Sequence, residues 1–256
     1  MDDKEQARAA GPSTEEPLSA ADLWRALGAG WRDFLAYPAY GLFFASIFVS
    51  VGLITAYLAL TKGETAWLII AAAGFPLLAP FTAVGLYEVS RRRETGERLH
   101  WSAILGAVRG RGDEQILAMG VILFVAFGFW MIVAHAVFAI FVGEAGLGSD
   151  PLAIFESTAG LVMLLVGSLI GGLMAFGFYT VTVFSLPMLL DREVDILTAI
   201  IASLRAFSSN RFVLTAWAVL VLGGLLLAMV PIFIGLLIAI PVFGHATWHL
   251  YRRAVG

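Results

Sequence analysis

Cysteine is absent from the 256 residues, and this absence excludes disulfides, thiolate nucleophiles and cysteine-ligated metal centres. Charge is also scarce, because 14% of the residues are charged against about 25% in soluble domains. The net charge of -3 provides no clustered cationic surface, so we expect no nucleic-acid partner. Sequence patterns for nucleotide binding, zinc proteolysis and serine hydrolysis are missing as well. We therefore expect no catalytic residue, no cofactor and no metal site.

Apolar residues make up 60% of the chain, more than a soluble protein of this length could bury. This composition predicts an all-α polytopic membrane protein, because a helix satisfies its backbone hydrogen bonds internally. About 20 apolar residues cross the hydrocarbon core, and the sequence contains six such runs. The predicted spans are 39–60, 66–89, 115–142, 159–190, 212–230 and 232–251. We expect them to form one transmembrane domain, 19–256, after a disordered tail, 1–18.

The distribution of lysine and arginine predicts how the chain is threaded. If both termini are cytoplasmic, every Lys and Arg except Lys62 falls on the cytoplasmic side of the six spans. Such a bias is typical of inner loops, which carry an excess of cations. We therefore expect a multi-pass protein with cytoplasmic N- and C-termini.

Three short amphipathic stretches, 19–34, 100–112 and 191–210, precede outgoing spans on that side. Their apolar residues recur at helical spacing. Ser19 and Asp22 predict a capping box at the first helix, Asp191 an N-cap for the third and Asn210 its end. We expect these helices to lie in the headgroup plane; the alternative is that they pack under the bundle as connectors. The apolar sets are Leu23, Trp24, Leu27 and Trp31; Trp101, Ile104, Leu105 and Val108; and Val194, Leu197, Ile201 and Leu204.

The three stretches also align with one another, which suggests a weak internal triplication. Each copy would contain a surface helix, an outgoing span and a returning span. In PFTAVGLYEVSRR (80–92) and PVFGHATWHLYRR (241–253) a proline precedes paired arginines at the same spacing. The matched positions in the surface helices are Ala26, Leu27 and Arg32; Ala103, Ile104 and Arg109; and Ala199, Ile200 and Arg205.

Glu88, His245 and His249 form a candidate ionisable cluster. The repeat aligns Glu88 with His249, and His245 lies one turn deeper on the same helix face. Ionisable groups at membrane depth are costly and mark functional candidates. Three interpretations stay open: an interfacial belt with Trp248 and neighbouring aromatics, a buried pair that titrates, and a metal or haem site.

Two further sets of residues have a functional and a structural interpretation. Anionic lipid headgroups could bind the arginine cluster, although the threading alone also predicts it. The small-residue ridge of the fourth span allows close helix approach, either inside the bundle or between two copies. The arginines are Arg91, Arg92, Arg93 and Arg98, and the ridge is Gly167, Gly171 and Ala175.

Four stretches carry a family resemblance: AGWRDFLAYPAYGL (29–42), GLYEVSRRRETGE (85–97), SLPMLLDREVDILTAIIASLRAF (185–207) and GHATWHLYRR (244–253). They resemble the prokaryotic family of predicted integral membrane proteins called domain of unknown function 2189. The likeness extends over most of the chain beyond residue 20. It implies six helices in a bacterial inner membrane, and the family has no established activity.

We expect a non-catalytic inner-membrane protein that acts as a scaffold, an assembly factor or a lipid-interacting factor. Its expected partners are membrane lipids, with other membrane proteins or further copies of itself. The first alternative is a small transporter or channel with the ionisable cluster at its cytoplasmic mouth. The second is a haem- or metal-binding membrane protein.

Overall fold

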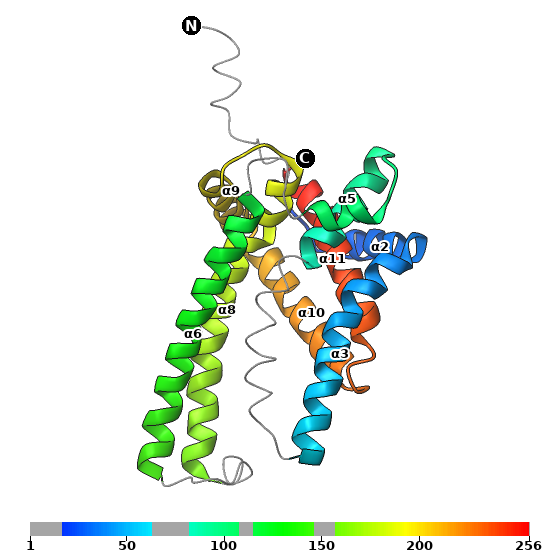
Figure 1. The fold of residues 1–256 in the computed structure, drawn as a ribbon. Coiled ribbons are helices and arrows are strands. Elements are labelled where there is room, and N and C mark those ends of the chain that lie inside the picture. The colour runs from blue at the N-terminus through cyan, green and yellow to red at the C-terminus, as the bar shows by residue number, and fades with distance from the viewer. Residues whose placement is uncertain (1–16, 63–81, 108–114, 146–156, 256) are drawn as a thin grey trace, which may run out of the picture.

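A computed structural model describes residues 17–62, 82–107, 115–145 and 157–255. These residues form helices joined by short turns, and no strand occurs among them, so the expected all-α class is confirmed. One further helix, at 82–95, carries no label in Figure 1. The labelled helices are α2 (Ala20–Ala36), α3 (Pro38–Lys62), α5 (Trp101–Gly106), α6 (Gln115–Ala145), α8 (Thr158–Asp191), α9 (Ile196–Ser209), α10 (Arg211–Met229) and α11 (Leu236–Val255).

Four of the described helices are long and apolar enough to cross a membrane: Pro38–Leu58, Gln115–Phe141, Thr158–Asp191 and Arg211–Met229. They correspond to the first, third, fourth and fifth predicted spans. The protein is therefore a membrane protein with several apolar helices.

The other two predicted spans have different outcomes. Much of 66–89 lies outside the described residues, as do residues 146–156 after α6 and most of the predicted tail. The sixth span, 232–251, corresponds to a turn followed by α11 from Leu236. The last two turns of α11 carry His249 and two arginines, which makes this helix less apolar than the other four. Six crossings therefore stay a prediction.

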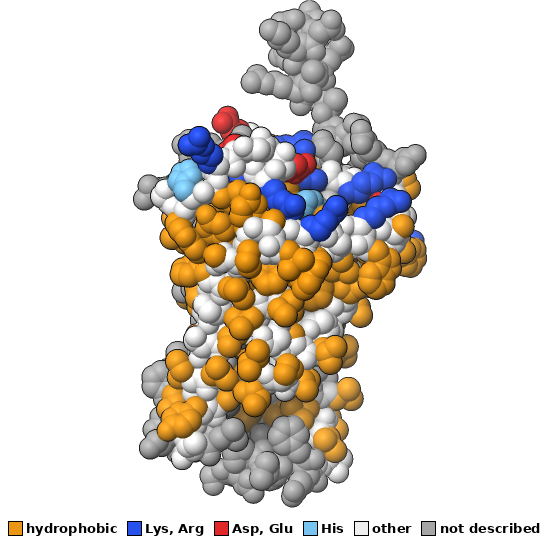
Figure 2. Space-filling model, turned by 90° about the vertical axis from the view of Figure 1, so that its right-hand side faces the viewer, with side chains coloured by type: hydrophobic (Ala, Val, Ile, Leu, Met, Phe, Trp, Pro, Cys, Tyr) orange, Lys and Arg blue, Asp and Glu red, His pale blue; other side chains and the backbone are white. Residues whose placement is uncertain are grey.

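The helices α2, α5 and α9 and the C-terminus gather at one end of the molecule, and α3, α6, α8 and α10 extend away from it (Figure 1). On the face shown in Figure 2, the Lys and Arg side chains that are coloured cluster at this end, above a broad band of hydrophobic side chains. We call it the basic end. The segregation is that expected of a chain whose cations stay on one side of a bilayer.

The packed core lies near the basic end. It contains the last turns of α8 from Val183 to Leu190, together with Leu214 and Trp217 of α10 and Trp248 of α11. Farther along α8, Leu165 and Leu173 are about two-thirds exposed, at 70% and 66%. Because lipid tails are as apolar as leucine, exposure of these side chains in a bilayer carries little cost.

The short helices α2 and α9 bury small residues and expose several large apolar residues, although Leu23 and Phe34 of α2 are also buried. In α2, Ala26 and Gly30 are buried, whereas Trp24 is 69% exposed. In α9, Ala199 is buried and Leu197 is 66% exposed. The predicted apolar faces are therefore only in part the packing faces. Leu23 is buried, and Leu27 and Val194 pack against the core. In α5 the pattern is mixed, since Ile104 is buried while Trp101 and Leu105 are exposed.

The predicted helix ends are confirmed in two cases and wrong in one. Ser19 donates its N–H to the Asp22 carboxylate over 2.9 Å, as a capping box requires, and Asn210 ends α9. The N-cap of α9 is Asp195, not Asp191, because Asp195 accepts the N–H of Thr198. Asp191 is instead the last residue of α8.

Leu18 belongs to the folded core, although the predicted tail extended through it. Its side chain is buried, and its N–H donates to the Asn210 side-chain oxygen over 2.7 Å. One residue, Asn210, thus ends α9 and binds the backbone of Leu18.

Helix packing near the basic end follows the order of the predicted repeat. The last helix of the third copy, α11, packs against α2 of the first, and α8 of the second packs against α9 of the third. The helix at 82–95 places Leu86 and Val89 against Ile104 of α5. Each returning helix therefore contacts the short helix of the next copy.

Candidate functional site

The crossing of α2 and α11 depends on a glycine. A Cβ at Gly30 would lie 2.6 Å from the backbone N of Ala246 and 2.6 Å from the carbonyl oxygen of Val242. Such contacts do not occur between real atoms, so only glycine permits this approach. The close crossing brings Asp33, one turn later on α2, within hydrogen-bonding distance of His249 on α11.

Asp33 is the centre of the site. Its carboxylate accepts a hydrogen bond from the Ser90 hydroxyl at 2.6 Å and one from His249 Nε2 at 2.7 Å. Arg93 pairs with the other oxygen through Nη1. The side chain is 3% exposed. Burial raises the pKa of Asp33, but the hydrogen bonds from His249, Ser90 and Arg93 and the electrostatic effect of His249 outweigh burial and lower the pKa to about 2.

Ser90 joins this carboxylate to a second, fully buried histidine. The Ser90 Oγ lies 2.8 Å from His245 Nδ1. An ionised carboxylate can only accept, so the single Ser90 proton goes to Asp33 and His245 Nδ1–H donates to Ser90. His245 is then the neutral Nδ1–H tautomer. Its Nε2 atom carries a lone pair, is buried and has no hydrogen-bond partner among the described residues.

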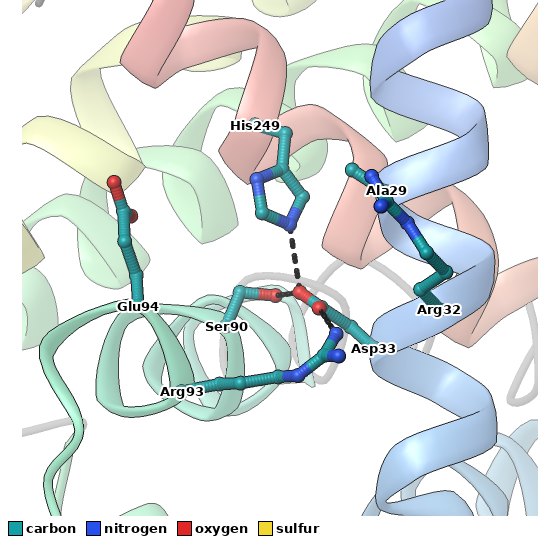
Figure 3. A pocket seen from close by; sticks show the side chains of 7 residues that line it. All are labelled: Ala29, Arg32, Asp33, Ser90, Arg93, Glu94 and His249. Atoms are coloured by element: carbon teal, nitrogen blue, oxygen red, sulfur yellow. Dashed lines mark hydrogen bonds and ion pairs between the residues drawn. The ribbon is translucent and has the colours of Figure 1, made fainter.

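An open pocket of about 250 Å³ lies beside these groups. Figure 3 shows His249 from α11, Asp33 from α2 and Ser90 and Arg93 from the 82–95 helix converging on one point. The pocket combines guanidinium and carboxylate groups with an imidazole and a hydroxyl, so it can bind a polar or charged group. Its lining residues are Ala29, Arg32, Asp33, Ser90, Arg93, Glu94 and His249.

Glu88, the carboxylate predicted to share this site, has other partners. It accepts from Arg91 Nε at 2.7 Å and also pairs with Arg92. Arg91 in turn binds Glu97 at 2.8 Å. The hydrogen bond from Arg91 lowers the pKa of Glu97 to about 2. His245 and His249 therefore lie together around Asp33, and Glu88 belongs to an adjacent arginine cluster.

Internal carboxylates engage three of the four arginines proposed to bind lipid headgroups. Arg91 and Arg92 pair with Glu88 and Glu97, and Arg93 pairs with Asp33. Arg98 is exposed and offers its carbonyl oxygen to Arg92. Much of the positive charge in this cluster is thus used within the fold.

The returning helices are tied together beside the pocket. Arg252 of α11 binds Asp191 at the end of α8 and Glu94 on the 82–95 helix, at 3.1 and 3.2 Å. Trp248 donates its indole N–H to the same Glu94, and the Tyr251 hydroxyl donates to Asp191. The helices that carry His249 and Ser90 are therefore fixed relative to each other.

The small residues of α8 pack unequally. A Cβ at Gly171 would meet the Trp130 ring of α6 at 2.7 Å, and one at Gly167 would meet Val137 at 3.9 Å. Ala175 is exposed. The interpretation of close packing inside the bundle thus fits Gly171 best.

The remaining histidines lie apart from the site. His135 of α6 is exposed and contacts the Met131 carbonyl of its own helix. His100 precedes α5 and contacts the carbonyl of Arg98. Across the described ranges, no group of three or more His, Cys, Asp or Glu side chains could hold a metal ion.

Sequence reasoning identified the two histidines but missed Asp33 and Ser90. Asp33 is not among the predicted site residues, yet it lies on the buried stripe of Ala26 and Gly30. A carboxylate three residues after a glycine, on a stripe of small residues, is the signal that could have revealed it.

Comparison with protein families gives a match over part of the chain. No curated protein and no solved structure is similar to the chain. The matching family was expected from four sequence stretches, of which GLYEVSRRRETGE (85–97) lies wholly inside the matched segment. The family model described as "Predicted integral membrane protein (DUF2189)" matches residues 68–191, which confirms the expected resemblance to this family over that segment.

Proposed function

We propose that this protein is a non-catalytic scaffold or assembly factor that interacts with lipid at one face of the bilayer. In this proposal the chain crosses a bacterial inner membrane six times as three copies of one unit. The basic end and both termini face the cytoplasm, where cations are retained. The short helices lie at the level of the lipid headgroups.

The observation that carries the proposal is the outward display of large apolar side chains by the short helices. Trp24, Trp31 and Leu35 are exposed on α2, while Leu197 is exposed on α9. Outside a membrane these side chains would face water on the most polar part of the molecule. Amphipathic helices with tryptophan and leucine on one face and arginine beside it are typical of the membrane interface.

The exposed side of α2 has an apolar part and a basic part. At roughly 100° per residue, Trp31 and Leu35 project within about 20° of Trp24, and Arg25 and Arg32 project about 80–100° from it. A helix lying flat at the interface would direct the first group into lipid and the second toward headgroups and water.

Partners other than lipid could contact the exposed apolar side chains of α6 and α8. The outer residues of both helices are largely exposed and apolar, so another membrane protein or a second copy of the chain could pack there. Purification in mild detergent within a complex larger than one chain would favour the assembly role over lipid interaction alone.

The proposal is tested by single-cysteine labelling, which the cysteine-free sequence makes unambiguous. Trp24→Cys and the control Arg25→Cys would each carry an environment-sensitive fluorophore in lipid nanodiscs. We expect the label at 24 to be quenched by lipids with a nitroxide near the headgroup, and the label at 25 to be quenched by aqueous iodide. Equal access of iodide to both labels would contradict the interfacial position of α2.

Transport is the second candidate, and one observation favours it. His245 is fully buried, and the Ser90 and Asp33 hydrogen bonds connect it to the pocket at the basic end. A solute or proton flux in proteoliposomes that disappears in His245→Phe would favour transport over a scaffold.

A further inference from the structure

We propose that the pocket beside Asp33 binds a phosphate-bearing anion through Arg32 and Arg93. The ligand would be a phosphodiester or phosphomonoester group that enters between α2 and the 82–95 helix. Both arginines line the pocket and come from different elements (Figure 3). A phosphate held by both would bridge those elements.

Of the two arginines that line the pocket, Arg32 has the guanidinium group that is more available to a ligand. In the part of the chain that the structure describes, its one hydrogen bond runs from Nε to the Gly28 carbonyl at 3.3 Å. No carboxylate pairs with Arg32 among those residues. Its two terminal nitrogens can therefore donate to a ligand. A guanidinium recognises phosphate with paired N–H donors, which makes arginine well suited to such a site.

Arg93 supplies a second guanidinium with donors to spare. Within the described residues it pairs with Asp33 through Nη1. Its side chain is 37% exposed, so the other nitrogens can face the pocket. A guanidinium has five N–H donors, and one bond to Asp33 leaves enough for a phosphate oxygen.

The two carboxylates in the pocket are already committed to protein donors. Asp33 accepts from Ser90, His249 and Arg93. Glu94 lies across the pocket and accepts from Trp248 and Arg252. Arg93 pairs with Asp33, and Arg252, which does not line the pocket, pairs with Glu94. Among the described residues no carboxylate pairs with Arg32, so its charge is not neutralised in this way. The pocket offers an anion more attraction than repulsion.

A phosphate could come from a lipid headgroup or from solution. The pocket lies on α2 beside the exposed Trp31 and Leu35, which in the proposed function would lie among lipid headgroups. The lipid source thus rests on the proposed function, and the free anion does not. The volume of about 250 Å³ well exceeds the roughly 30 Å³ that one water takes up in the liquid.

The test compares Arg32→Gln with Arg205→Gln in the full chain. Arg205 follows Ala199 on α9 by the same spacing as Arg32 follows Ala26 on α2, is exposed, and does not line the pocket. Delipidated protein in neutral detergent would be titrated with inorganic phosphate against chloride at matched ionic strength and pH. A second titration would add phosphatidylglycerol or phosphatidylcholine and count retained lipids by native mass spectrometry.

We expect phosphate, phosphatidylglycerol or both to bind the wild type, and Arg32→Gln to need about tenfold more ligand while Arg205→Gln behaves as wild type. Arg32-dependent stabilisation by inorganic phosphate would identify a soluble anion as a ligand. Arg32-dependent retention of phosphatidylglycerol alone would identify the headgroup. Absence of both responses, or equal weakening in the two variants, would overturn the proposal.

These outcomes are separable from failure of the proposed function. If the labels at positions 24 and 25 show that α2 is away from lipid, Arg32 can still bind soluble phosphate. If α2 lies at the interface but both variants keep the same lipid, the interfacial helix stands and the phosphate site fails.

Discussion

Replacement of Asp33 by asparagine is the sharpest perturbation of the site, because it removes one charge and hardly changes the shape of the side chain. The carboxylate accepts from three side chains on two other helices. An amide keeps one acceptor oxygen and turns two N–H donors toward groups that are themselves donors. The α2–α11 crossing and the link to the 82–95 helix should both weaken.

The size of the loss follows from the exposure of the partners. Ser90 is 1% exposed, so a lost hydrogen bond there leaves a buried hydroxyl and costs about 1.5–3 kcal/mol for a bond to a charged group. His249 and Arg93 are 25% and 37% exposed, so water can replace part of what they lose, at about 0–1 kcal/mol each. We expect Asp33→Asn to lower the free energy of unfolding by about 2–3 kcal/mol.

The assay is thermal unfolding of the detergent-purified protein followed by tryptophan emission. One kcal/mol corresponds to about 2–4 °C for a chain of this size, so the midpoint should fall by roughly 5–10 °C. Glu193→Gln removes an exposed carboxylate and should leave the midpoint nearly unchanged. Asp33→Asn and His249→Asn, separately and together, should show a coupling of at least about 0.5 kcal/mol.

Two results would refute the reasoning. A midpoint for Asp33→Asn within about 1 °C of that for Glu193→Gln would mean that Asp33 does not hold the helices together. Strict additivity of Asp33→Asn and His249→Asn would mean that the two side chains do not interact in the folded protein.

Two further predictions follow from the same site. The fold lowers the pKa of Asp33 from its ordinary value of 3.8 to about 2. The stability that its ionised form contributes is therefore present above about pH 4 and is lost as the pH falls through 2. We expect acid to lower the free energy of unfolding of the wild type by about 1–2 kcal/mol over this interval, after allowance for partial hydration. In the same melting assay, Asp33→Asn should lose less stability over the same pH interval. Gly30→Ala should lower the unfolding midpoint by several degrees, because its Cβ would overlap the α11 backbone. A Cβ at Gly28 would meet nothing within 4 Å, so Gly28→Ala should raise or preserve the midpoint. Equal midpoints for the two variants would show that α2 and α11 do not cross closely.

Much of the architecture could be predicted because hydrophobic length is a local signal. The continuous apolar runs predicted α3, α6, α8 and α10, and the amphipathic stretches predicted the short helices. It was harder to predict which face of each short helix packs against the rest of the protein. Trp24 and Leu197 belong to the predicted apolar sets of their helices and are exposed, yet Ala26 and Ala199 are buried. In a membrane protein large apolar side chains gain as much from lipid as from a core, so hydrophobicity alone does not identify the packing face.

The site was only half predictable because its contacts join residues far apart in the chain. Asp33 and His249 are separated by 216 positions, and Ser90 and His245 by 155. Sequence reasoning paired Glu88 with His249 through the repeat, but Glu88 has Arg91 three residues away and Arg92 four residues away. Pairing with a residue on the same helix loses less conformational entropy than pairing with a distant one. Glu88 therefore pairs with the two arginines, and Asp33 is the carboxylate that binds His249.

The fastening of α8, α11 and the 82–95 helix by Arg252 has a mechanical consequence. These helices are joined at the basic end, and lipid covers much of their remaining length. They can therefore change their tilt in the membrane while most of the contacts at the basic end are kept. Bilayers differ in thickness by several ångströms, and helices meet that difference mainly by tilting. A protein built in this way can keep the geometry of its basic end in membranes of different thickness. A partner that binds the basic end would then meet the same surface in each membrane.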